Sequence, residues 1–163
     1  MRALVHPEDA AWIETAIDQW AASLRWDLRG EAVSPPLLQA LLWDDVARQQ
    51  VLLADGQSIG LLQMTGFDLV NGLANLEVLL DAGSDRLAPD VDGFLHDAFG
   101  SFPLRKVMLH VGGTRLDVGA LLGEGSEFRA HRAASYAAHL HAGGASYRPV
   151  EVFEILPAER GRG

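Results

Sequence analysis

The sequence predicts one α/β domain of the α+β kind, in which a mixed central sheet of about six to seven strands is flanked by helices. Three observations predict it. Apolar residues recur at helical spacing between residues 12 and 46, they alternate with polar residues between 51 and 80, and one more helical pattern then separates two strand-like runs. The 163-residue length is typical of a single domain, which we expect over residues 1–158, with a flexible tail at 159–163.

The first predicted element is an amphipathic helix. Pro7, Glu8 and Asp9 suit a first helical turn, where a missing N–H is harmless and acidic side chains are favourable. The apolar residues that follow are three or four positions apart, and they predict a helix that buries Trp12, Ile13, Ala16, Ile17, Trp20 and Leu24.

A second helix is predicted from Ser34, whose side chain can cap the first turn, and from Pro35, which fits the first helical position. Its predicted buried stripe consists of Leu37, Leu38, Leu41, Leu42 and Val46.

The pattern then becomes extended. Residues 51–54, 58–65 and 73–80 have the composition of strands, and the intervening Asp55-Gly56 and Asn71-Gly72 pairs are typical of hairpin turns. We therefore expect an antiparallel meander of three strands.

One helix and one strand follow the meander. A helix starting near Pro89 would bury Val91, Phe94, Leu95, Ala98 and Phe99. Residues 105–111 are predicted to form a buried strand, and because one helix separates them from the strand at 73–80, the two strands should be parallel neighbours. A short helix at 116–122 and two strands, at about 127–141 and 146–156, complete the chain.

Three stretches carry a resemblance to a known family: DGQSIGLLQ at residues 55–63, FDLVNGLANLEVLLD at 67–81 and FGSFPLRKV at 99–107. The first two resemble the second to fourth strands of the GNAT N-acetyltransferase superfamily. The third, with the closing hairpin, resembles the branch of ribosomal-protein and small-molecule N-acetyltransferases. The resemblance covers about residues 50–156 and implies the GNAT fold and transfer of an acyl group to an amine.

The resemblance also implies acetyl-CoA or another acyl-CoA as cofactor. In GNAT enzymes the pantetheine arm pairs with backbone groups of the fourth strand, where this strand splays from the fifth. That implies a V-shaped cleft between the parallel strands at 73–80 and 105–111. The residues of the implied donor site are Leu76, Val78, Leu79 and Leu80.

The implied pyrophosphate loop departs from the family pattern, Arg/Gln-x-x-Gly-x-Gly/Ala. Residues 81–92 read DAGSDRLAPDVD, about three residues short, and leave Gly83, Ser84 and Arg86 as candidate phosphate contacts. Three acidic side chains oppose a phosphate there, although they equally suit a helix N-terminus: Asp85, Asp90 and Asp92. An altered but working CoA site, a donor other than free CoA, and a lost donor site all remain open.

Glu77 is the candidate general base. Strand alternation puts it on one face with Asn75 and Leu79, and burial would raise its pKa enough to accept a proton from an ammonium group. A solvated or salt-bridged glutamate is the alternative. Tyr136 and Tyr147, both on the closing hairpin, are candidates for protonating the leaving thiolate, as the family often uses a tyrosine; buried packing is the alternative for each.

Histidines offer two weaker candidates. His131, His139 and His141 could share a strand face and ligate zinc, but no partner in a recognised spacing accompanies them, and we expect no metal. His110 either reaches the splayed region or is a hydrogen-bonded inner histidine.

Composition excludes several classes of function. The chain has no cysteine, which removes thiol nucleophiles and disulfides, and its net charge of −9 opposes nucleic-acid binding. No apolar run is long enough to span a membrane, and Glu8 and Asp9 interrupt any secretory signal, so we expect a cytoplasmic protein.

Two functions follow as hypotheses. The first is a GNAT-like N-acyltransferase that moves an acetyl or other acyl group from a CoA thioester to an amine of a small molecule or peptide, with a homodimer allowed by the resemblance. The second is a non-acetylating protein of the same fold that has lost CoA binding and binds a metabolite or protein, or performs another tailoring reaction in biosynthesis.

Overall fold

The computed structural model describes residues 1–3, 9–17, 19–26, 28, 32–81, 88–112, 116–141 and 147–158. The elements are α1 (Ala10–Ala16), β1 (Ala21–Ala22), the 3₁₀ turn η1 (Leu24–Trp26), α2 (Pro35–Trp43), β2 (Val46–Ala54), β3 (Gln57–Asp68), β4 (Leu73–Leu80), α3 (Ala88–Ser101), β5 (Lys106–Gly112), α4 (Val118–Leu122), β6 (Phe128–His141) and β7 (Tyr147–Pro157). None of the helices in these ranges is long and apolar enough to cross a bilayer.

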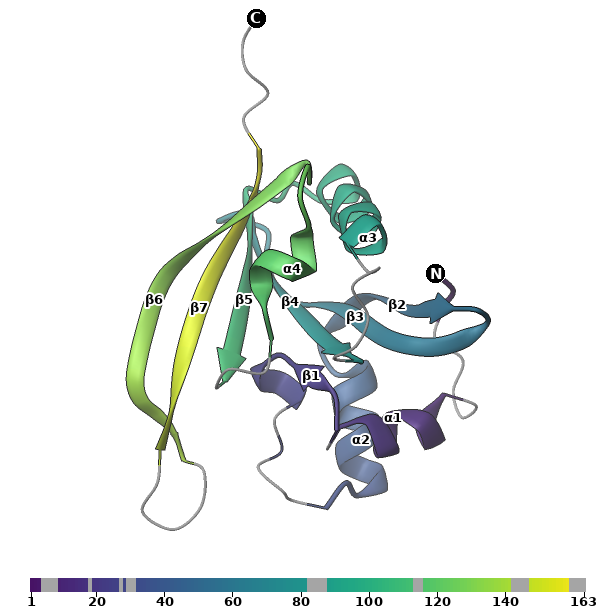
Figure 1. Cartoon of the computed structure of the whole chain (residues 1–163). Helices are drawn as coiled ribbons and strands as arrows, with labels where there is room; N and C mark the ends of the chain where they lie inside the picture. Colours follow the sequence, from purple (N-terminus) through teal and green to yellow (C-terminus); the bar gives the residue numbers. More distant parts are fainter. Residues whose placement is uncertain are drawn as a thin grey trace, which may run out of the picture.

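A mixed sheet lies at the centre of the molecule (Figure 1). Within the described residues it has seven strands in the order β2-β3-β4-β5-β7-β6, with β1 added beside β4. Helices α1 and α2 pack on one face, against Val51, Leu61 and Leu79, whereas α3 and α4 pack on the other. The predicted fold class and strand number are confirmed.

The first helix is shorter than the sequence predicts. It ends at Ala16, and the chain then forms β1 and η1 instead of continuing as a helix to Leu24. Trp12 and Trp20 still meet, with ring centroids 5.3 Å apart. The prediction was wrong because helical spacing reports only where apolar side chains recur, whereas the backbone near residue 22 gains hydrogen bonds to β4 that a helix could not make.

The second helix begins as predicted, with the Ser34 hydroxyl accepting a hydrogen bond from the Leu37 N–H at 3.4 Å. It ends at Trp43, so Val46 opens β2 instead of extending the helical stripe. Asp45 explains the break: its φ of 58° is left-handed, and its carboxylate accepts a hydrogen bond from the Gly66 N–H at 2.9 Å.

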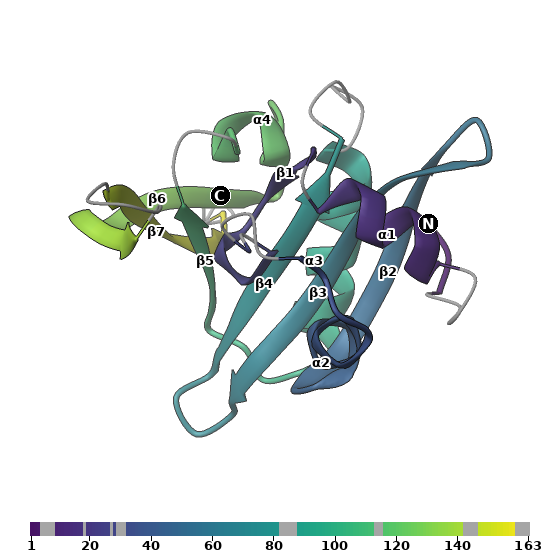
Figure 2. The same ribbon diagram turned by 90° about the horizontal axis from the view of Figure 1, so that it is seen from below.

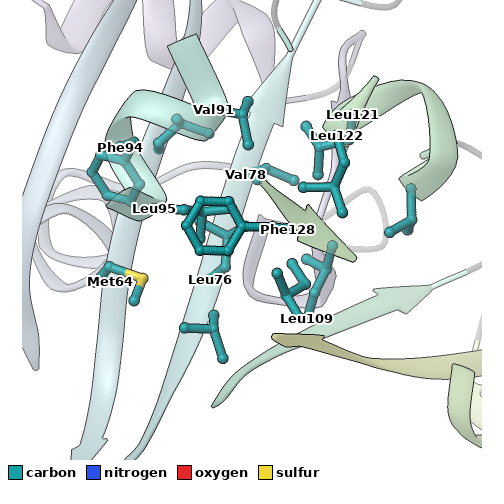
Figure 3. Packing of buried hydrophobic residues seen from close by; sticks show 14 of the residues in the cluster. Met64, Leu76, Val78, Val91, Phe94, Leu95, Leu109, Leu121, Leu122 and Phe128 are labelled. Carbon is teal, nitrogen blue, oxygen red and sulfur yellow. The ribbon is translucent and has the colours of Figure 1, made fainter. Parts of the chain in front are cut away.

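The meander and the third helix follow the predicted pattern. Strand β4 has the predicted bounds, and Asp55 and Gly56 have the positive φ values, 51° and 80°, of a tight hairpin turn. Helix α3 buries Val91, Phe94, Leu95 and Ala98, while Phe99 is only partly buried. Figure 3 shows Val91, Phe94 and Leu95 in one cluster of buried side chains with Leu76 and Val78 of β4 and Leu109 of β5.

Strands β4 and β5 form the predicted V. They pair in parallel only at Leu73↔Lys106, Ala74↔Val107 and Asn75↔Met108, after which β4 continues to Leu80 along β3. Strand β5 instead stays paired with β7 as far as Gly112. The predicted splay is confirmed, and it divides the sheet into a β4 arm and a β5-β7-β6 arm.

Candidate functional site

The edge of β4 that faces the splay is paired with the chain's own β1. Strand β3 takes one edge of β4, through Gly60↔Leu80 and Leu61↔Leu79, so the pairing of Ala21 with Leu80 and of Ala22 with Leu79 uses the opposite edge. Figure 2 shows β1 beside β4 on the side toward β5. The backbone groups that the GNAT resemblance assigns to the pantetheine arm are therefore engaged by residues 21–23.

Ser23 fastens this pairing with both its backbone and its side chain. Its N–H donates to the Val78 carbonyl at 2.8 Å, and its hydroxyl oxygen accepts from the Val78 N–H at 3.1 Å. The same hydroxyl donates to Oε2 of Glu77 at 2.6 Å. Ser23 is fully buried. Ser23 thus takes up hydrogen-bonding groups of the strand edge and of the candidate base at the same time.

The carboxylate of Glu77 lies on the sheet face that α1 and α2 cover, and its side chain is 8% exposed. Besides the bond from Ser23, the Thr65 hydroxyl donates to Oε1 over a longer 3.4 Å. Burial raises the pKa of the Glu77 carboxyl above its ordinary value, and the hydrogen bond from Ser23 and the charge of Arg25 only partly offset it. The Glu77 carboxyl is therefore buried and not solvated, it forms no ion pair with another of the described residues, and its pKa is shifted in the direction that a general base requires.

Arg25 connects the same segment to the end of α2. Its Nη2 donates to the carbonyls of Ala40, Leu41 and Asp44, at 3.1, 3.2 and 2.8 Å. These carbonyls lie at the C-terminal end of α2, where a cation is favourable, and the Ala40 carbonyl also accepts a hydrogen bond from the Asp44 N–H at 3.0 Å. Residues 23 and 25 therefore hold the segment to β4 on one side and to α2 on the other.

The predicted donor-site residues fall into two groups. Leu76, Val78 and Leu80 point into the core below α3, and Leu79 into the core below α1 and α2, so they offer only backbone groups to the splay. Gly83, Ser84 and Arg86, with Asp85, lie outside the described residues. Asp92 accepts from the Ser126 hydroxyl at 2.6 Å and from the Glu127 N–H at 3.3 Å, which gives it a structural role at the start of β6.

The two candidate tyrosines differ in what is described. Tyr136 of β6 is 50% exposed and lines a hollow of about 500 Å³ on the β5-β7-β6 arm, so the buried-packing interpretation is wrong for it. The side chain of Tyr147 lies outside the described part of the chain. His110 also lines the hollow and is half-buried, and burial lowers the pKa of its imidazole.

The other candidate histidines do not form a cluster in the described part of the chain. His131 Nε2 lies 3.0 Å from Oε2 of Glu154, and Oε1 of the same carboxylate accepts a hydrogen bond from Lys106. The side chains of His139 and His141 are outside the described residues. Among the residues that are described, no three His, Cys, Asp or Glu side chains gather in a way that could hold a metal.

Sequence reasoning missed Ser23, Thr65 and the apolar lining of the hollow, although it singled out His110 and Tyr136. Thr65 lies opposite Asn75 and could have been found from the hairpin register of β3 and β4. Met108 could have been found because it shares the alternate face of β5 with His110. Nothing in the sequence pointed to Ser23, because it lies within the stretch whose apolar spacing predicted a helix.

Comparison with solved structures identifies the same arrangement of elements in acetyltransferases. The spermidine N-acetyltransferase from Vibrio cholerae in complex with CoA and spermine matches with a TM-score of 0.66 and 18% identity, over 95% of this chain and 94% of that one. A dodecameric structure of that enzyme in an intermediate state gives 0.64 and 19%, over 95% and 91%. A probable acetyltransferase gives 0.62 and 16%, over 94% and 90%.

No protein-family model and no curated protein matches the sequence. At the identities of the solved structures, the likeness establishes the fold and leaves activity and substrate to the site itself. The resemblance drawn from the sequence is confirmed at that level: the chain has the GNAT fold of these acetyltransferases over about 95% of its length.

Proposed function

We propose that this protein is an N-acyltransferase that moves an acetyl or other acyl group from a CoA thioester to the amine of a small molecule or peptide. A CoA thioester would supply an activated acyl carbon. The chain would supply the cleft between β4 and β5 and a base for the ammonium proton. A cytoplasmic location and a homodimer remain predictions from the sequence.

One observation carries the proposal: a carboxylate with a raised pKa, Glu77, lies beside the splay of β4 and β5. An amine must lose a proton before or during attack on a thioester, and a base whose pKa approaches neutrality removes it most effectively. Structural glutamates of a sheet are usually exposed or paired with a cation, whereas Glu77 is buried among hydroxyl groups.

As long as β1 is in place, the cleft does not fit an acyl-CoA. The edge of β4 at residues 78–80 already has its hydrogen bonds, and Ser23 covers the Glu77 carboxylate. Donor binding therefore requires residues 21–23 to leave β4. The same movement would uncover Glu77, so that the base becomes accessible only when the donor edge is free.

The occupied edge also favours a second candidate, a protein of this fold that binds a ligand without acyl transfer. If β1 never leaves β4, the donor edge is a permanent part of the sheet. Asp90, in the first turn of α3, is then only a stabilising charge at a helix N-terminus.

Titration of the full chain with acetyl-CoA, followed by calorimetry, separates the two candidates. The wild type should bind, and thiol release should follow when a panel of primary amines is added. A matched titration with 3′-phospho-ADP, which lacks the pantetheine arm, shows whether the β4 edge contributes to affinity. Absence of acetyl-CoA binding in both the wild type and Ser23→Ala would remove acyl transfer from CoA and leave the second candidate.

A further inference from the structure

A hollow of about 500 Å³ lies over one face of β5, β7 and β6. Small-molecule sites commonly measure about 300–1,000 Å³, so this one can take a substantial organic group. Its apolar lining consists of Leu24, Met108, Ala133, Ala134, Val150 and Val152.

The hollow opens on the same face of the sheet as the candidate base. Asn75 and Met108 are partners in the short parallel ladder, so their side chains point to the same side. Alternation then puts Glu77 of β4 and His110 of β5 on that side as well. Val107, Leu109 and Val111 point to the opposite side, into the core below α3 and α4.

The lining of the hollow has little capacity for a charged ligand. No Asp, Glu, Lys or Arg of the described residues lines it, and its polar side chains are His110 and Tyr136. Burial lowers the pKa of His110, which keeps the imidazole neutral at pH 7. Glu154 lies opposite Met108 and therefore on this face of the arm, but its carboxylate already binds Lys106 and His131.

We expect a polyamine to bind weakly to this surface. An ammonium group inside the hollow would lose water without gaining a carboxylate from the described lining, and an unpaired buried charge is strongly unfavourable. An aliphatic chain or an aromatic ring would instead remove apolar surface from water on both sides.

We propose that the hollow binds an uncharged apolar group of a substrate, and that the protein prefers such substrates to polyamines. The proposal rests on the proposed function for the identity of the substrates. The apolar group belongs either to the acyl chain of the donor or to the body of the acceptor amine. Every lining residue except Leu24 belongs to β5, β6 or β7, so the hollow persists when residues 21–26 move.

The test measures binding to the full chain by calorimetry with two matched pairs of probes. Hexanoyl-CoA is compared with acetyl-CoA, and phenylethylamine with ethylamine, with spermidine as a polyamine. In one of the two pairs, the more apolar probe should bind more tightly than its matched partner, by about tenfold or more, because it buries additional apolar surface. The pair that shows it identifies the donor or the acceptor as the source of the group.

Variants of neighbouring residues on β6 link the preference to the hollow. Ala134 lies opposite Val152 and lines the hollow, so Ala134→Phe should fill it and remove the preference. Ser135 lies opposite Glu151 on the other face, so Ser135→Phe should keep the preference. Ala133→Leu, at an exposed lining position, replaces Ala134→Phe if that variant does not fold.

The proposal is overturned if neither pair shows a difference, if spermidine binds as tightly as phenylethylamine, or if the lining variants leave the preference unchanged. Because the readout is binding, it does not depend on turnover. A preference that disappears in the lining variants, together with no acyl transfer from any donor, would reject the proposed function and retain the apolar site.

Discussion

The two arms of the cleft are built from strands of the same sheet, yet they differ in almost every property that matters for a site. The β4 arm carries Glu77 with two hydroxyl neighbours, and the edge of β4 that faces the splay is paired with β1. The β5-β7-β6 arm presents a mainly apolar hollow, and it carries the ion pairs of Lys106 with Glu154 and of Arg132 with Glu151.

The difference separates two tasks. The candidate base lies on the arm that a short strand can cover, whereas the proposed selection of an apolar group takes place on the arm that stays open. Ser23 is the connection between them, because it binds Glu77 while the adjacent Leu24 contacts the hollow. The predictions below test whether the arms really have these separate tasks.

The largest effect is expected from Glu77→Gln, measured on turnover with a competent amine. Gln keeps the shape and can accept the Ser23 hydrogen bond, but it cannot accept a proton, so kcat should fall by about 100-fold or more. Circular dichroism should show an unchanged fold.

Glu151→Gln is the matched control on the other arm, since it removes a glutamate that pairs with Arg132 on the opposite face. Its kcat should stay within about twofold of the wild type, because exposed ion pairs contribute little. Equal kcat values for Glu77→Gln and the wild type would remove Glu77 from the chemistry and end the division of tasks.

A smaller effect is expected from Ser23→Ala, which removes the hydroxyl bonds to Glu77 and to the Val78 N–H. Loss of these bonds should loosen β1, increase hydrogen exchange of the Val78 amide, and tighten CoA binding by about fivefold. Pantetheine alone should gain as much as CoA, because β1 covers the edge of β4 that the resemblance assigns to the pantetheine arm.

Ser135→Ala, an exposed serine on the open arm, should change neither exchange nor affinity. Faster exchange at Val78 without tighter CoA binding would mean that β1 moves but that the edge is no donor site. Unchanged exchange would mean that Ser23 does not fasten the strand.

The smallest effect concerns pH, where glutamates of the two arms should behave oppositely. Burial raises the pKa of Glu77 above its ordinary value of 4.5, so its contribution to stability is complete below that pH and is lost as the pH rises through the raised pKa. The hydrogen bond from Lys106 lowers the pKa of Glu154, whose contribution is present above 4.5 and is lost as the pH falls.

Urea unfolding of the wild type, Glu77→Gln and Glu154→Gln between pH 4 and 8 measures both. The stability of the wild type relative to Glu77→Gln should decrease with rising pH, and relative to Glu154→Gln it should increase. Parallel pH profiles for the two variants would contradict the electrostatic contrast between the arms.

Much of the fold could be predicted because local patterns encode it. Alternation fixed the bounds of β4, a serine cap and a proline fixed the start of α2, and helical spacing identified the buried face of α3. The prediction of the first helix was wrong at its C-terminal end. The same apolar spacing also fits a chain that turns at residue 17 and still packs Trp12 against Trp20. Spacing alone cannot distinguish the two.

The sequence by itself determined the GNAT-like order of elements, the splay of β4 from β5, and the position of Glu77 on one strand face, because each depends on neighbours in the chain or on one strand–helix–strand unit. The tertiary structure alone decided that Ser23 meets Glu77 across 54 positions, that β1 takes the free edge of β4, and that a hollow forms on the other arm. These contacts join segments that are distant in the sequence. They form because an assembled sheet buries polar groups and leaves a strand edge whose backbone groups need partners, and neither condition exists before the sheet has assembled.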